Sequence, residues 1–362
     1  MIGPMSREAR KFAGEYATIF SGLWKYYRTG EADINAWSRL LQRHCETNGL
    51  SSDRAAALLR CLRPPRLPLT TSSLLGEFSI DTQNDIVSNI KRDGYHVFHT
   101  KIPSALCDEL EEFARKTPAI VEGRGAAQAD RVIFNPAEPI SKTYKIGMDA
   151  LLDCTAMQRL IGDPIFLGIA EQYFNALPIF CGAGMWWSPA YGDEPGADAA
   201  QLFHFDYDGA PIWLKYFIYL TDVGPRNGPH VFARSSHLSG HSSAKEIIAR
   251  GYVRIPDYDI EAAYGVENIV ELCGERGTVL AVDTRGFHKG KMPELNYRLV
   301  AQLFFDLPHF NVHADRQLLP FALDPVLANA MRDAPKVFER LVSRDLCGVK
   351  CSPADQTDRM AI

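Results

Sequence analysis

Hydrophobic side chains near the start of the chain recur every three to four positions, which is the spacing of one face of an α-helix. The positions that follow this spacing are Phe12, Tyr16, Ile19, Phe20, Leu23, Trp24, Tyr27, Ala55, Ala56, Leu58, Leu59 and Leu62. The pattern predicts a helical extension over residues 1–70. Its last helix ends at RPPRLP because consecutive prolines cannot continue a helix, and the Thr/Ser cluster TTSSL that follows has the composition of a linker.

A second unit begins near Ile80. The segment DTQNDIVSNIKRDG predicts an amphipathic helix with Asp81 as its candidate N-cap and Gly94 as its stop, and the next segment, YHVFHTKI, alternates like a short strand. Helices are also predicted for SALCDELEEFARKT and for residues 149–176. Residues 119–148 are polar and rich in Gly, Ala and Pro, so we expect them to form a loop or lid at an active site.

The pattern changes again at Pro178. From there to Pro308, short runs of Val, Ile, Phe, Tyr and Trp are separated by Gly, Pro, Asn and Asp, which is typical of antiparallel β structure. From about residue 316 the helical spacing returns in PVLANAMRDAPKVFERLVSRDL. The sequence therefore predicts an α+β fold with three parts: the extension, a β-rich domain over 78–315, and a C-terminal helix and tail over 316–362.

Composition and charge narrow the function classes. The chain has 362 residues, of which 46% are hydrophobic and 23% charged, as in an ordinary globular protein. Its net charge of −5 provides no cationic field for nucleic acid or acidic lipid, and no apolar run is long enough for a signal peptide or a membrane span. We therefore expect a cytoplasmic protein without a nucleic-acid or membrane partner. Residues 1–70 carry a net charge of +5 and the remainder −10, which favours a basic extension that docks on an acidic body or forms a homo-oligomer contact.

The eight cysteines are spread along the chain without a C-x-x-C pair, which argues against a zinc ribbon or a thioredoxin-type site. Most are expected to be reduced and structural. Cys347 and Cys351 are four positions apart, where one helical turn would bring them together.

The candidate chemistry begins with LFHFDYD at residues 202–208. Read as a strand, this segment points His204, Asp206 and Asp208 to one side and its aromatic residues to the other. A surface strand would show the same alternation. However, an imidazole and a carboxylate two positions apart on one face can share one metal ion, and His288 in GTVLAVDTRGFHKGK supplies a third ligand. Two histidines and one carboxylate form the facial triad that suits non-haem Fe(II), and zinc is the less natural alternative.

The three candidate metal ligands are accompanied by a cationic residue. Arg298 begins the nearly apolar strand RLVAQLFFDL, ten residues after His288. A guanidinium in such a strand needs an anionic partner. That partner is either a protein carboxylate, in a structural ion pair, or a dicarboxylate co-substrate held by the bidentate fork of the arginine. The neighbouring histidine favours the co-substrate.

Five motifs together resemble the Fe(II)- and 2-oxoglutarate-dependent oxygenases of the phytanoyl-CoA dioxygenase type. They are RDGYHVFHTKIPSALCDEL at 92–110, H-F-D at 204–206, LTDVGPRNGPHVFARSSH at 220–237, VDTRGFHKG at 282–290, and Arg298. The resemblance covers about residues 80–310. It implies a double-stranded β-helix, a jelly-roll of the cupin type with flanking helices. It also implies that His204, Asp206 and His288 bind Fe(II), that Arg298 binds the distal carboxylate of 2-oxoglutarate, and that O2 is the oxidant.

The resemblance implies hydroxylation of a C–H bond in a small molecule, with release of succinate and CO2. It places Phe217 at the 2-oxoglutarate pocket. Lys215 and Asp208 share the parity of the metal-bearing face and are candidates for contacting substrate. Asp206 stands where halogenating relatives have a small residue, which argues against halogenation. The chain departs from the usual Pro-Gly-Ser-His turn at Ala233-Arg234-Ser235-Ser236-His237, which lacks the glycine.

Alternative functions stay open. The same four residues would serve a desaturase or a cyclase, a metal-binding module without turnover would keep the fold, and a zinc hydrolase would use the same ligands. The remaining histidines, His230, His237 and His241 among them, lie in loop-like or structural contexts and are not expected to bind metal. No nucleotide-binding, serine-hydrolase or zincin motif is present in the sequence.

Overall fold

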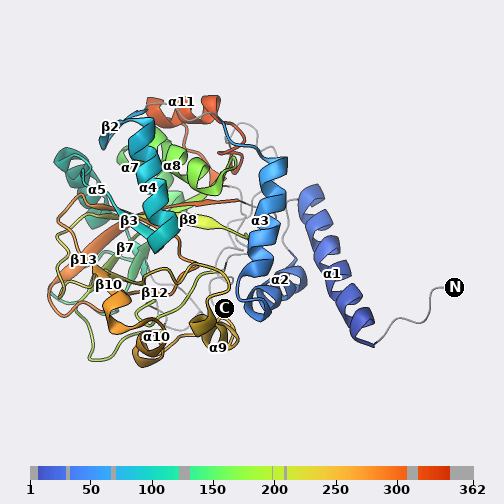
Figure 1. Cartoon of the computed structure of the whole chain (residues 1–362). Coiled ribbons are helices and arrows are strands. Elements are labelled where there is room, and N and C mark those ends of the chain that lie inside the picture. Colours follow the sequence, from blue (N-terminus) through green and yellow to red (C-terminus); the bar gives the residue numbers. More distant parts are fainter. Residues whose placement is uncertain are drawn as a thin grey trace.

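The computed structural model describes residues 7–29, 33–66, 71–121, 131–197, 199–207, 210–307 and 317–342. The predicted helical extension is confirmed as three helices: α1 (Arg7–Thr29), α2 (Ile34–Glu46) and α3 (Leu50–Leu62). Asp33 caps α2 by accepting hydrogen bonds from the backbone amides of Asn35 and Ala36. Figure 1 shows α1 at the outer edge of the molecule, with α2 and α3 between it and the strands.

The α2 helix is docked on the β-rich domain through aromatic side chains. The ring of His44 lies 5.7 Å from that of Phe205 and 4.9 Å from that of Tyr207, and Trp37 lies 6.5 Å from Tyr207. His44 is 5% exposed, and its Nδ1 pairs with Ser52 Oγ at 2.9 Å. The extension therefore covers the outer side of the segment that carries the candidate metal ligands.

The segment after the extension is not only a linker. Within TTSSL, β1 (Thr71–Ser73) forms an antiparallel hairpin with β2 (Gly76–Phe78). The predicted helix follows as α4 (Ile80–Asp93), but its N-cap is Ser79 rather than Asp81, because the Ser79 hydroxyl accepts from the amide of Thr82. Gly94 ends α4 with a φ of 90°, in the left-handed region that glycine adopts readily.

Eight strands form the main antiparallel sheet, in the order β3-β11-β8-β13-β7-β6-β4-β5. Their bounds are β3 (Tyr95–Val97), β4 (Ala119–Val121), β5 (Arg131–Val132), β6 (Tyr144–Ile146), β7 (Ile179–Pro189), β8 (Trp213–Tyr219), β11 (Val279–Val282) and β13 (Tyr297–Asp306). The prediction that 119–148 forms a polar loop is wrong for β4, β5 and β6, which extend the sheet at one edge. Residues 122–130 lie outside the described residues.

A second, smaller sheet completes the β domain. It has the order β10-β9-β12 and consists of β9 (His230–Ala233), β10 (Ile269–Leu272) and β12 (His288–Gly290). Isolated bridges join His204 to His288 and Phe203 to Ile255, so the segment around His204 continues this sheet beyond β12. Two antiparallel sheets with these crossed connections form the predicted double-stranded β-helix.

Short helices separate β9 from β10. They are the 3-10 helix at Ser242–Ala244, α9 (Lys245–Ile248), α10 (Asp257–Tyr264) and the 3-10 helix at Val266–Asn268. Ile247, Ile248, Ile260 and Tyr264 from this part pack with Phe205 and Phe287 in one buried cluster. The sequence pattern does not predict this helical interruption of the β-rich region.

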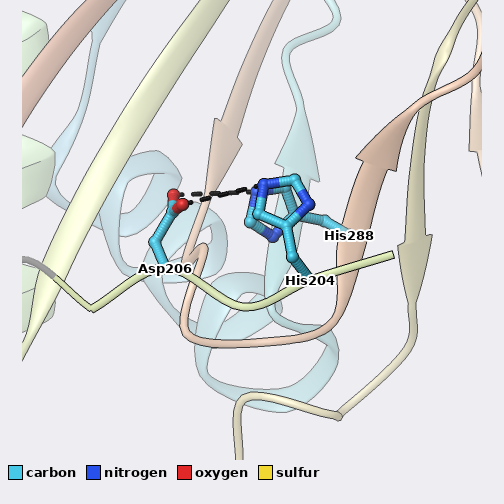
Figure 2. A group of neighbouring side chains, drawn as sticks. All are labelled: His204, Asp206 and His288. Carbon is cyan, nitrogen blue, oxygen red and sulfur yellow. Dashed lines mark ion pairs between the residues drawn. The ribbon is translucent and has the colours of Figure 1, made fainter. Parts of the chain in front are cut away.

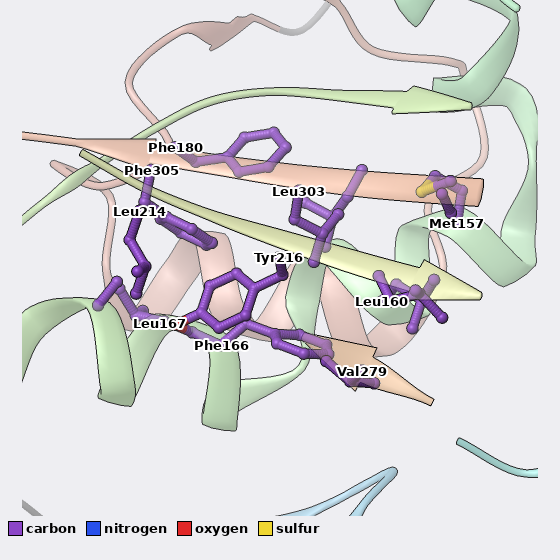
Figure 3. Packing of buried hydrophobic residues seen from close by; sticks show 14 of the residues in the cluster. Met157, Leu160, Phe166, Leu167, Phe180, Leu214, Tyr216, Val279, Leu303 and Phe305 are labelled. Atoms are coloured by element: carbon purple, nitrogen blue, oxygen red, sulfur yellow. The ribbon is translucent and has the colours of Figure 1, made fainter. Parts of the chain in front are cut away.

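The main sheet buries one face against helices. These helices are α5 (Ser104–Lys116), α6 (Met148–Asp153), α7 (Thr155–Gly162) and α8 (Pro164–Phe174). Along β8, Leu214, Tyr216 and Ile218 join this hydrophobic core, and Figure 3 shows Leu214 and Tyr216 beside Phe166 and Phe305. The alternate residues of β8 consequently point to the other face, into the barrel.

The C-terminal prediction is correct only at its start. Helix α11 (Pro325–Asp333) forms, but the chain leaves the helix at Ala334 because Pro335 has no amide hydrogen for it. Strand β14 (Gln317–Leu318), which precedes α11, pairs in parallel with β15 (Leu341–Val342), which follows it. Residues 343–362, with Cys347 and Cys351, lie outside the described residues. Within the part of the chain that is described, no helix has the length and apolar character of a membrane span.

The burial of His44 where α2 docks predicts that the stability of the fold depends on pH. Burial lowers the pKa of His44 to about 3, further helped by Arg285 and opposed by Asp283. In the unfolded chain the His44 imidazole binds a proton near pH 6.5. The stabilisation that comes from burying the neutral ring is therefore fully present above that pH and is lost as the pH falls toward 3. Between about pH 7.5 and 5, His44 should account for about 2 kcal/mol of lost stability.

Urea unfolding followed by circular dichroism at the two pH values tests this expectation. His44→Phe keeps a ring but cannot bind a proton, so its loss of stability on acidification should be smaller than that of the wild type. His99→Phe, at an exposed position, is the control and should retain the wild-type dependence. Equal losses in wild type and His44→Phe would contradict the assignment.

Candidate metal centre

His204 and His288 are brought face to face by backbone pairing. The two residues exchange hydrogen bonds, from the amide of each to the carbonyl of the other, at 3.0 and 2.9 Å. Residues paired in this way point their side chains to the same face of a sheet, and the two rings lie 4.4 Å apart. The predicted strand at 202–208 is present only as these bridges, yet its predicted alternation holds, because Phe203, Phe205 and Tyr207 are buried on the other side.

Asp206 completes the group. Its carboxylate oxygens lie 3.8 Å from His204 Nε2 and 3.6 Å from His288 Nε2, as the dashed lines in Figure 2 show. One ligand atom from each of the three residues lies within 4.8 Å of the others. His204 and His288 are 6% and 5% exposed, so the three groups converge in a buried site as the sequence predicted.

Both imidazoles are oriented for metal binding by their second nitrogen. Nδ1 of His204 pairs with the Leu202 carbonyl and Nδ1 of His288 with the Gly286 carbonyl, each at 2.9 Å. A carbonyl only accepts, so Nδ1 carries the proton and Nε2 keeps its lone pair. Burial lowers the pKa of His204 to about 3 and that of His288 below its usual value, which keeps both rings neutral.

The Asp206 carboxylate is held by a lysine. Lys215 Nζ donates to Asp206 Oδ2 at 2.6 Å, and the Asp206 amide donates to the Thr284 carbonyl at 2.8 Å. Burial would raise the pKa of Asp206, but the interactions with its neighbours, of which that with the Lys215 ammonium is the strongest, hold the pKa well below its usual value. Asp206 is therefore ionised and able to act as a ligand.

A compact turn before His288 fixes this arrangement. Arg285 forms a buried ion pair with Asp283 at 2.6 Å, and the Tyr173 hydroxyl donates to the same carboxylate at 2.5 Å. Gly286 follows, where a Cβ atom would lie 2.3 Å from the Phe232 ring. The turn thus requires glycine for close packing and supplies the carbonyl that orients His288.

Arg298 is buried without a protein carboxylate. It is 6% exposed, donates through Nη1 to the Gly228 carbonyl and through Nη2 to Ser188 Oγ at 3.4 Å, and leaves Nε unpartnered. Burial lowers its pKa, opposed by Tyr219. Among the described residues no carboxylate pairs with this guanidinium, which excludes them as partners in the structural ion pair considered above.

The other predicted site residues lie as follows. Phe217 points into the barrel as its parity requires, with its ring 6.3 Å from Trp186 and 4.7 Å from His230. Lys215 shares that parity and is engaged by Asp206, so its contact with substrate stays a prediction. Asp208 lies outside the described residues.

His230 is the residue that sequence reasoning missed. It does not lie in a loop but at the start of β9, where its ring stacks on that of His288 at 5.3 Å and an interplanar angle of 14°. The missed signal was its place at the head of the short apolar run HVFA. His237 packs beside Gly94 with Nε2 3.2 Å from the Lys91 carbonyl. Ser235 has a φ of 62°, in the left-handed region that glycine adopts more readily than serine.

No family model matches the chain, and no curated protein matches it. Solved structures with a similar fold include the non-heme alpha ketoglutarate dependent carbocyclase SnoK from nogalamycin biosynthesis, with 17% identity over 67% of this chain and 87% of that chain (TM-score 0.44). EctD from S. alaskensis with bound Fe has 20% identity over 67% of this chain and 83% of its own, also with a TM-score of 0.44. HygX from Streptomyces hygroscopicus, with nickel and 2-oxoglutarate bound, has 12% identity over 61% and 86% (TM-score 0.44). The fold assignment rests on the sheet topology of the chain itself.

The geometry predicts a single metal site that depends on each of the three ligands. His288→Ala should lower the affinity for Fe(II) or Co(II) by more than about a hundredfold, because removing one ligand costs more than the ten- to hundredfold effect of losing an outer-shell partner. Equilibrium dialysis with metal analysis under anaerobic conditions measures the effect. His96→Ala, at a half-buried position on β3, is the matched control and should bind metal like the wild type. Full metal binding by His288→Ala would remove this residue from the site.

Proposed function

We propose that the protein is an Fe(II)- and 2-oxoglutarate-dependent oxygenase that hydroxylates a C–H bond of a small molecule. The observation that carries the proposal is a buried guanidinium, without a partner carboxylate among the described residues, beside a buried cluster of two neutral imidazoles and one ionised carboxylate. Three of the five motifs of the family resemblance supply these groups, and the NGPH segment lies against them.

The donor set fits ferrous iron. Two imidazole nitrogens and a carboxylate oxygen on one side of an ion leave the opposite positions open for other ligands, and each imidazole is held in the required tautomer by a backbone carbonyl. Bound Fe(II) supplies the activation of O2, with one oxygen atom entering the substrate and the other entering succinate as 2-oxoglutarate loses CO2. His204, Asp206 and His288 would hold the iron.

The distance from the triad to Arg298 suits a diacid. A Cβ atom on Gly290 would lie 3.2 Å from Arg298 Nη2, so the guanidinium lies next to the residue two positions after His288. Two residues of a strand span about 7 Å. A 2-oxo diacid that chelates at one end can therefore reach Arg298 with its second carboxylate, and a side chain at position 290 would crowd the guanidinium.

The residues around the site have separate tasks. Arg298 binds and orients the co-substrate, Lys215 fixes Asp206, and Phe217 and Trp186 exclude water on the barrel side. Asp206 occupies the position that a halide would need, which supports hydroxylation over halogenation. The prime substrate is a small molecule in this proposal, and Lys215 and Asp208 are its candidate polar contacts.

Succinate release with Fe(II), 2-oxoglutarate, O2 and ascorbate tests the proposal. Arg298→Ala should raise the concentration of 2-oxoglutarate required by at least about thirtyfold, since removing one partner of a buried charge pair costs about 2 kcal/mol or more. Arg298→Lys should not restore the wild-type requirement, because an ammonium cannot form the bidentate fork.

The same assay separates the alternative functions. A binding module would bind Fe(II) and 2-oxoglutarate without forming succinate in the presence of candidate substrates, and a zinc hydrolase would keep its activity without O2. His96→Ala, which leaves the site intact, is again the control and should require as much 2-oxoglutarate as the wild type. Unchanged succinate formation by Arg298→Ala would contradict the role assigned to that residue.

A further inference from the structure

The inner face of β9 presents a histidine that the proposed function leaves unused. His230 is 6% exposed, and its Nε2 atom is buried without a hydrogen-bond partner among the described residues. Leaving such an atom unpaired costs about 1–3 kcal/mol. Its backbone amide is satisfied, because it donates to the Tyr219 hydroxyl at 3.0 Å. The orphaned imidazole nitrogen is therefore available to a ligand.

Two contacts place His230 next to Arg298. The guanidinium donates to the carbonyl of Gly228, two residues before His230. On the other side, Gly290 pairs with His230 in the β12–β9 register and lies beside Arg298 Nη2.

His230 also contacts both ends of the proposed co-substrate pocket. Its ring stacks on the metal ligand His288 at 5.3 Å and lies 4.7 Å from Phe217. Ser188 and Tyr219 are further polar groups near Arg298. Ser188 Oγ accepts from Arg298 Nη2 at 3.4 Å, and the Tyr219 hydroxyl already donates to the Leu272 carbonyl at 2.7 Å and accepts from the His230 amide. His230 Nε2, in contrast, has no hydrogen-bond partner in the part of the chain that the structure describes.

We propose that His230 Nε2–H and Arg298 Nε–H bind the same ligand carboxylate, the distal carboxylate of the 2-oxo diacid. This inference rests on the proposed function. Both nitrogens are buried and unpartnered within the described part of the chain, and one carboxylate has two oxygens to accept from them. His230 is thus a specificity residue that selects a 2-oxo diacid over a 2-oxo acid without a second carboxylate.

The test compares two 2-oxo acids by calorimetry on the Co(II)-loaded, O2-free protein. 2-Oxoglutarate has the distal carboxylate, and 2-oxobutyrate lacks it but chelates metal in the same way. His230→Leu should weaken 2-oxoglutarate binding by about ten- to hundredfold, the effect of one hydrogen bond to a charged group, and leave 2-oxobutyrate binding within about twofold. His230→Gln, whose Nε2 can take the place of the imidazole nitrogen, should restore most of the selectivity.

The readouts distinguish the possible failures. Equal weakening of both acids by His230→Leu, or no weakening of either, overturns the role of His230. Failure of the Co(II)-loaded wild type to bind 2-oxoglutarate contradicts the proposed function instead. His96→Leu controls for the loss of a partly buried imidazole elsewhere. If His230→Leu does not fold, as judged by circular dichroism, His230→Met and His230→Gln give the same comparison, and a Met variant with wild-type selectivity overturns the inference.

Discussion

The burial of three aromatic side chains determines where the candidate metal ligands point. Phe203, Phe205 and Tyr207 are each no more than 3% exposed and pack in one cluster with Phe287 and side chains of α2. Because side chains in an extended segment alternate, burying these rings outward turns His204 and Asp206 inward. A shift of one residue would expose the aromatic rings to the barrel and remove both ligands, so the packing free energy of the cluster also enforces the register of the site. Side chains of α2, among them Trp37 and His44, cover the outer side of this segment. The extension therefore packs against the β domain as part of its structure.

Two cations inside the barrel, Lys215 and Arg298, differ in how their charge is compensated. Near the triad, Asp206 is balanced by Lys215, so the buried carboxylate stays ionised. Near β7, the Arg298 cation has only a carbonyl and a hydroxyl as hydrogen-bond partners within the described chain. Buried charge without a counter-ion is costly, and proteins keep it where a ligand supplies the opposite charge. This asymmetry between Lys215 and Arg298 is the physical basis for the proposal that the first holds a candidate metal ligand and the second binds a co-substrate.

Local signals accounted for much of the fold. Periodicity located the helical extension that contains α1–α3, the helices α4 and α5, and the β-rich region. Gly94 ended α4, and H-F-D with His288 identified the candidate metal ligands. Errors arose where a local pattern had two interpretations. Ser79 and Asp81 are both capping residues, and only the backbone path selected Ser79. Residues 144–146 are too short a run to be recognised as a strand, and pairing with β7 makes them one. Pro335 was visible, but the apolar spacing beyond it suggested a longer helix.

The sequence by itself determined which residue types could form a metal site and which face each would share, because both follow from side-chain chemistry and the two-residue period of an extended chain. Only the tertiary structure decided which groups meet. It paired His204 with His288 across many residues, joined Lys215 to Asp206, left Arg298 without a carboxylate among the described residues, and stacked His230 on His288. Such contacts depend on strand register between segments far apart in the chain, and register is set by the packing of the whole barrel rather than by any local pattern.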